Sequence, residues 1–296
     1  MGDPQGESVL AAATAAMRGG NPRDAARLVE TALEQFRTRA DADGQMRATN
    51  LAGAIAFERG RLDEAERAFG EALELARRLG DRLVEARASN NLASVAHLRG
   101  RPEAALSLYR GALLSYQRLG DRRGAAETWH NLSLSFRQVP DLRQADDAAV
   151  EAVRHAELAG EPALIALTML GRAEVNLERR DYPLAARGIE RAWELAEKAG
   201  DQLGVAEARR VAALLAYRQG EYARARSEAE SAREVARAQD SALLAAECAG
   251  VAALAARALG DAAAADQLRS EATTGYRALG ADSLLARLEE AWNAPA

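Results

Sequence analysis

Apolar positions recur along this chain on two scales. Within residues 62–79, Ala65, Phe69 and Ala72 lie on one face of a helical wheel, and charged residues occupy the other faces. On the longer scale, alanine returns at every fortieth position in two separate frames. The two series are Ala25, Ala65, Ala105, Ala145, Ala185, Ala225 and Ala265, and Ala32, Ala72, Ala112, Ala152, Ala192, Ala232 and Ala272.

Glycine marks the ends of the helices that this pattern predicts. In the second repeat, a helix is expected over residues 45–59, a turn at Gly60, a second helix over residues 62–79 and another turn at Gly80. Glycine adopts the positive φ that closes a helix without strain. No segment shows the alternation of β-branched residues that is typical of a strand. The sequence therefore predicts an all-α protein.

Self-similarity at one fixed period indicates stacked structural repeats. We expect an α-solenoid of about seven helix–turn–helix repeats over residues 7–280, preceded by a disordered N-terminus over residues 1–6. A C-terminal capping helix and tail are expected over residues 281–296, where Asp282 or Ser283 can cap the helix; a docking helix for a partner is the alternative. The expected repeats are about 7–40, 41–80, 81–120, 121–160, 161–200, 201–240 and 241–280.

The spacing of small and large residues resembles the tetratricopeptide repeat (TPR) family. The fourth repeat shows it best, with Trp129, Leu132, Ser133 and Phe136 preceding Ala145. The period of 40 is longer than usual and is similar to the long repeats of kinesin-light-chain-like and bacterial regulator proteins. HEAT and armadillo repeats are the alternative. The TPR resemblance implies a right-handed superhelix whose first helices line a concave groove.

Composition narrows the classes of partner. The net charge is −5 with a pI of about 5.5, which does not favour direct binding to nucleic acid. Aromatic residues make up 4% of the chain, so the core must consist mainly of alanine, leucine and valine. The chain has no stretch typical of a signal peptide or a membrane span, and its one cysteine, Cys248, lies in an alanine-rich stretch. We expect a bacterial, cytoplasmic protein.

The first helices of the second to fourth repeats carry the candidate binding residues. Asparagine recurs there although it is a mediocre helix former, and its amide can both donate to and accept from a peptide backbone. Arginine would pair with an acidic partner segment. The alternative is that the asparagines join neighbouring helices to each other. The candidates are Arg47, Asn50, Phe57, Arg87, Asn90, Asn91, His97, Glu127, His130, Asn131 and Arg137.

The later repeats carry apolar candidates instead. An apolar strip could accept an amphipathic helix, could mediate self-association, or could simply be packing between helices. Its members are Leu170, Leu177, Leu214 and Tyr217. Leu167 and Leu254 are expected to face inward as well, with Glu174, Arg210 and Arg257 between these apolar positions.

Motifs for catalysis, metal binding and phosphate binding are absent from the sequence. We therefore expect no catalytic residues, no metal and no cofactor. Three functions stay open: a scaffold or adaptor that binds a protein or peptide in its groove, a regulatory sensor for a small effector or signalling peptide that acts through a separate partner, and an accessory or assembly subunit of a larger complex.

Overall fold

The computed structural model describes residues 3–18 and 21–294, and within these ranges it contains α-helices and no strands. The all-α prediction is confirmed. The helices are α1 (Pro4–Arg18), α2 (Pro22–Thr38), α3 (Ala42–Glu58), α4 (Leu62–Leu79), α5 (Arg82–Leu98), α6 (Pro102–Leu119), α7 (Arg122–Gln138), α8 (Leu142–Ala159), α9 (Pro162–Glu178), α10 (Tyr182–Ala199), α11 (Gln202–Arg218), α12 (Tyr222–Ala238), α13 (Ala242–Ala258), α14 (Ala262–Leu279) and α15 (Asp282–Asn293).

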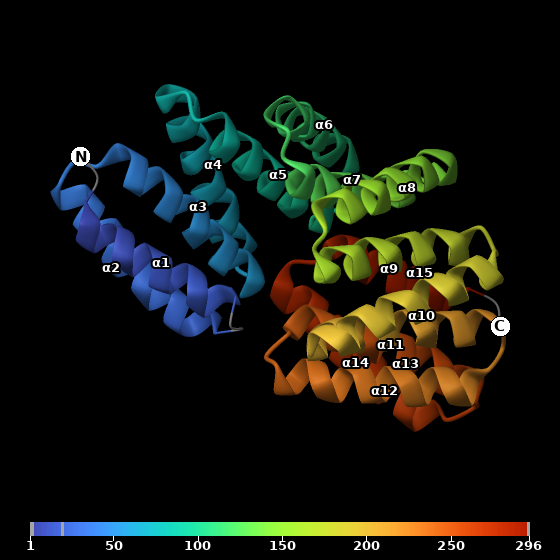
Figure 1. Cartoon of the computed structure of the whole chain (residues 1–296). Coiled ribbons are helices and arrows are strands. Elements are labelled where there is room, and N and C mark those ends of the chain that lie inside the picture. Colours follow the sequence, from blue (N-terminus) through green and yellow to red (C-terminus); the bar gives the residue numbers. More distant parts are fainter. Residues whose placement is uncertain (1–2, 19–20, 295–296) are drawn as a thin grey trace. The chain divides into compact units, whose positions relative to one another are not determined.

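Each 40-residue repeat forms one pair of helices (Figure 1). We call the odd-numbered helices from α1 to α13 the A helices and their even-numbered successors the B helices. A and B pack against each other within a repeat, as in α3 with α4 and α13 with α14. The predicted helix over residues 62–79 coincides with α4. None of the described helices has the length and hydropathy needed to span a bilayer.

The helix ends follow from their local sequence. Gly80, Gly160 and Gly200 adopt the left-handed conformation that ends a B helix. Asp41 and Asp201 each precede an A helix, and their carboxylates accept a hydrogen bond from the backbone N–H three residues later. Each repeat boundary is therefore specified by residues that adjoin it.

The core is built on the recurring alanines. All fourteen members of the two alanine series are at most 2% exposed. The glycines of the A helices permit a similarly close approach: a Cβ atom at Gly53 would lie 2.6 Å from the Phe69 ring. Side chains of this size allow the helix backbones to approach closely, and the few large side chains fill the remaining space.

The helices fall into two compact units. Unit 1 comprises Met1–His97 and Glu103–Gly120, and unit 2 comprises Leu98–Pro102 and Asp121–Ala296. Unit 1 thus contains α1 to α6 apart from Leu98 and Pro102 at the ends of α5 and α6, and unit 2 contains α7 to α15. That residues 7–280 act as one elongated domain stays a prediction.

Two expectations at the ends of the chain need correction. Residues 1–6 were expected to be disordered, and residues 1–2 lie outside the described part, but Pro4 begins α1 and Asp3 accepts a hydrogen bond from the N–H of Gln5. At the other end, α15 begins one residue earlier than a cap at Asp282 or Ser283 requires. Its N-cap is Ala281, which has no side chain that can accept a hydrogen bond.

We predict that Ala105→Leu lowers the free energy of unfolding by about 1–3 kcal/mol, because Ala105 is fully buried and a larger side chain overpacks the helix contact. The adjacent Ala104 is exposed on the same helix, α6, and so Ala104→Leu is the matched control. Urea denaturation of both variants measures the difference. Equal stability of the two variants would contradict the close packing at the recurring alanine.

Candidate functional site

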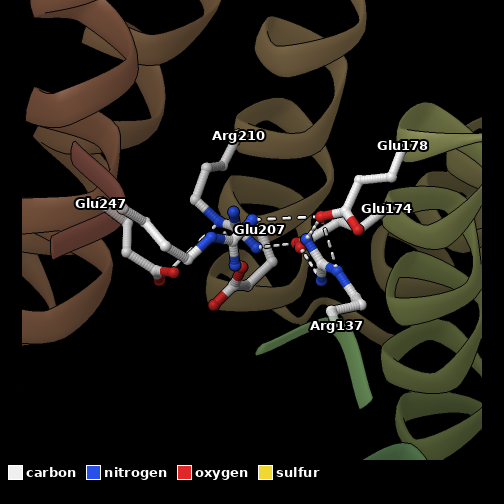
Figure 2. Close-up of polar contacts among 7 residues, drawn as sticks. Arg137, Glu174, Glu178, Glu207, Arg210 and Glu247 are labelled. Atoms are coloured by element: carbon white, nitrogen blue, oxygen red, sulfur yellow. Dashed lines mark hydrogen bonds and ion pairs between the residues drawn. The ribbon is translucent and has the colours of Figure 1, made fainter. Parts of the chain in front are cut away.

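Four A helices of unit 2 lie in succession, because α7 contacts α9, α9 contacts α11, and α11 contacts α13. Charged side chains from all four helices meet on one side of this row (Figure 2). We call this set the A-face stripe. Its members are Arg137, Glu174, Glu178, Glu207, Arg210 and Glu247.

Arg137 of α7 forms one end of the stripe. Its guanidinium lies 2.6 Å from a carboxylate oxygen of Glu174 and 2.7 Å from one of Glu178, both on α9. Only 4% of the Arg137 side chain is exposed. Glu174 and Glu178 are four residues apart, so they share one face of α9 and together hold a single guanidinium.

Arg210 of α11 continues the stripe. It donates to Glu174 at 2.5 Å and to Glu207 of its own helix at 3.1 Å. Its Nε atom lies 3.8 Å from a carboxylate oxygen of Glu247 on α13. Glu174 therefore bridges two arginines, and Arg210 stands among three carboxylates, as Figure 2 shows.

The two ends of the stripe differ electrostatically. Burial opposes the ionisation of Glu174, but the charges of Arg210 and Arg137 outweigh it and hold the pKa of this carboxyl far below its usual range. Burial raises the pKa of Glu247 to about 7; Arg210 opposes this rise, and the charges of Glu207 and Glu174 add to it. Four carboxylates face two guanidiniums on these helices, and the unbalanced negative charge lies at the Glu247 end.

Among the predicted residues of the fourth repeat, Arg137 belongs to the stripe. His130, also on α7, lies against α9: a Cβ atom at Gly171 would be 2.5 Å from its Nδ1 atom. Burial lowers the pKa of His130 to about 4, so the ring is neutral at physiological pH. Glu127 pairs with Arg123, and Asn131 is half-buried.

The predicted residues of the second and third repeats lie in unit 1. Arg47 is already paired, with Glu7 of α1 at 2.9 Å and with Asp43. Asn50 has a buried Oδ1 atom without a hydrogen-bond partner in the described part of the chain. Of the other five predicted residues in unit 1, Arg87 is exposed and Asn90 is buried. The remaining three are half-buried: Phe57, Asn91 and His97.

The predicted apolar strip needs correction. Leu170 and Leu177 are buried in the core formed by α9, α10 and α11, so they line no open surface. Leu214 is half-buried against the same core, and Tyr217 packs against Tyr222 with ring centroids 5.5 Å apart. Leu167, which is also expected to face inward, is the exposed leucine of α9; it lies seven residues before Glu174 and therefore on the same face of the helix.

Glu178, Glu207 and Glu247 were not among the candidate residues. Glu207 and Glu247 are 40 residues apart and so occupy the same position in consecutive repeats. Glu7 and Arg47 occupy this position too, and they pair with each other. A comparison of charges at equal repeat positions would have drawn attention to them. Among the described residues, no group of three or more His, Cys, Asp or Glu side chains is arranged to hold a metal ion.

Comparison with known proteins identifies the repeats. The family model for the tetratricopeptide repeat matches residues 44–113 and 84–157. No curated protein sequence matches the chain.

Solved structures resemble the fold at low sequence identity. The Rap conjugation gene regulator of plasmid pLS20, in complex with the Phr* peptide, has a TM-score of 0.75, with 17% identity over 97% of this chain and 76% of that chain. A Rap protein complexed with competence and sporulation factor has a TM-score of 0.72, with 15% identity over 98% of this chain and 92% of that chain. NprR in complex with its cognate peptide NprX has a TM-score of 0.66, with 13% identity over 99% of this chain and 87% of that chain. These similarities establish a helical-repeat array.

We predict that Glu174→Gln lowers the free energy of unfolding by about 3–5 kcal/mol, because it leaves two buried guanidiniums without their shared counter-ion. Glu194→Gln is the control, since Glu194 pairs with Arg191 on the exposed surface of α10 and should contribute less than about 1 kcal/mol. Chemical denaturation tests both variants. A similar small loss in both would mean that the stripe does not stabilise the fold.

We predict a pH-dependent gain in stability for Glu247→Gln. In the folded protein Glu247 keeps its proton up to about pH 7, whereas an ordinary glutamate loses it near 4.5, so its ionisation removes stability as the pH rises between these values. Glutamine cannot ionise, and the variant should be about 1–3 kcal/mol more stable than the wild type at pH 8 and equal to it at pH 4.5. Thermal unfolding at both pH values measures this.

The control for this pH dependence is Glu234→Gln, at an exposed position of α12. It should change the melting temperature equally little at both pH values. A Glu247→Gln variant that behaves in the same way would contradict the unbalanced charge at this end of the stripe.

Proposed function

We propose that this chain, in which the tetratricopeptide-repeat model matches residues 44–157, is a non-catalytic interaction module that binds a peptide or partner segment on the A helices of unit 2. The observation that carries the proposal is the A-face stripe, in which charged side chains of four successive A helices meet on one side of the row that these helices form. The proposed contact residues are the carboxylates at its more exposed end, Glu207 and Glu247, together with Leu167.

Packing alone does not explain the charges of the stripe. The alanine core already holds the helices together, and buried ion pairs are often no more stabilising than apolar residues of similar size. Their arrangement leaves negative charge beside an exposed leucine. A partner segment with a basic side chain next to apolar ones would complement both features.

The similar structures support a peptide as the ligand. The Rap conjugation gene regulator, the second Rap protein and NprR were each solved with a bound peptide or factor. This likeness also favours the alternative in which the chain is a regulatory sensor for a signalling peptide and acts through a separate partner. A bacterial origin and a cytoplasmic location stay predictions from the sequence, as does the absence of direct nucleic-acid binding.

The candidates in unit 1 form a second part of the proposal. Arg47 and Asn50 lie on α3, and Asn50 retains a buried oxygen without a hydrogen-bond partner in the described part of the chain. Such an amide could hold the backbone of an extended peptide.

A photo-crosslinking experiment tests the proposed surface. Benzoylphenylalanine replaces Leu167, which is 43% exposed on the A helix α9, or Leu158, which is 50% exposed on the B helix α8. We predict that irradiation in cells of the native host links a partner to position 167 and not to position 158. Equal crosslinking at the two positions, or none at 167, would remove this face from the proposal.

A charge reversal then tests the chemistry of the contact. Glu207→Lys in the Leu167 photo-crosslinking variant should reduce capture of the partner about tenfold, which corresponds to about 1.4 kcal/mol. Glu194→Lys, on the exposed face of α10, is the matched control and should leave capture unchanged. An equal effect of the two reversals would mean that the carboxylates of the stripe do not recognise the partner.

A further inference from the structure

The helix α15 contacts the A-face stripe from outside the repeats. The guanidinium of Arg287 lies 3.2 Å from Oε1 of Glu178, a residue 109 positions earlier on α9. The same carboxylate oxygen accepts a hydrogen bond from Arg137. A carboxylate of the proposed binding surface is thus already in contact with a basic side chain of this chain.

Apolar contacts accompany this ion pair. Leu288 is buried against Ala246 and Ala249 of α13 and Tyr276 of α14. The Trp292 ring lies 5.2 Å from the guanidinium of Arg257, which also donates to the Trp292 carbonyl oxygen. The helix α15 therefore presents a basic side chain beside apolar ones, which is the chemistry that the stripe and Leu167 would select in a partner.

The attachment of α15 is weaker than that of the repeat helices. Of its residues Asp282–Asn293, Leu288 alone is buried. Its N-cap, Ala281, offers no side-chain hydrogen bond, whereas α14 begins with a capping hydrogen bond from Asp261. Gly280, in the left-handed conformation, joins α15 to α14. Detachment of α15 would leave the contacts between α13 and α14 in place.

The ion pair between Arg287 and Glu178 is weakened by the neighbouring charge of Arg137. The charge of Arg137 and burial both lower the pKa of Arg287, although Glu178, Glu174 and Glu247 attract it. Arg287 thus approaches the stripe at the end where another arginine already stands. The charge of Arg287 also acts on Glu247, so a partner cation beside Glu207 and Glu247 would be repelled by Arg287 as long as α15 stays in place.

We propose that α15 is an intramolecular competitor for the A-face stripe, and that a partner segment gains full access only when α15 detaches about Gly280. This inference rests on the proposed function, since it concerns the same surface. It makes α15 more than a cap for the last repeat: Arg287 and the apolar side chains beside it occupy the place that a basic side chain and apolar neighbours of a partner would take.

The test uses the full chain and a fluorescein-labelled synthetic peptide with the sequence of residues 282–294. The variant Arg287→Ala/Leu288→Ala removes both contacts of α15, and we expect it to bind the peptide about tenfold more tightly than the wild type in fluorescence anisotropy. The single substitution Arg287→Ala should raise the affinity for the peptide about threefold. Hydrogen exchange of the α15 amides should accelerate in the same order while that of α13 stays unchanged.

The matched control is Glu289→Ala/Glu290→Ala, which changes two exposed residues on the same helix. It should bind the peptide as the wild type does. The competitor model is overturned if the Arg287→Ala/Leu288→Ala variant binds no more tightly than this control, or if no variant binds the peptide.

Photo-crosslinking at position 167 separates this inference from the proposed function. If the partner is captured equally in the wild type and in the Arg287→Ala/Leu288→Ala variant, the surface functions but α15 does not compete for it. If the variant binds the peptide but no partner is captured, α15 occupies the surface and the proposed function fails. Increased capture in the variant supports both.

Discussion

The close approach of helices at methyl-sized side chains is the constraint on which the rest of this structure depends. Both alanine series are buried, and Gly53 lets the Phe69 ring reach the backbone of α3. Because the contacts within and between repeats use small residues, the interior needs few large ones. The faces of the helices that point away from these contacts can therefore carry charge without weakening the core.

This constraint explains which parts of the fold were predictable from the sequence. Helix ends depend on neighbouring residues, so α4 was located correctly from Gly60 and Gly80. The predicted helix over residues 45–59 begins three residues late, because Asp41 caps α3 and the helix starts at Ala42. At the N-terminus, composition suggested disorder, but the contact between Asp3 and Asp41, 38 residues later, lies beyond any local pattern.

The candidate site was less predictable, because it depends on the register between helices about 40 residues apart. Whether Glu174 meets Arg137 and Arg210 is decided by how α7, α9 and α11 are aligned, which no single helix records. Helical periodicity also failed to separate the two faces of α9. Leu170 and Leu177 face the core, and Leu167 is exposed. The alignment of neighbouring helices can be inferred only by comparing residues at equal positions of the repeats, such as Glu207 and Glu247.

The stripe combines rigidity with incomplete charge balance. At one end, Glu174 holds two arginines and joins three helices, so its geometry is fixed before any partner arrives. At the other end, Glu247 is half-buried near a single arginine and has a pKa of about 7. A preorganised surface loses little conformational entropy when it binds, and an unbalanced carboxylate gains most from an added cation. Recognition should therefore concentrate where the network is least satisfied, at the junction of α11 and α13, where the charge of Arg287 already acts on Glu247.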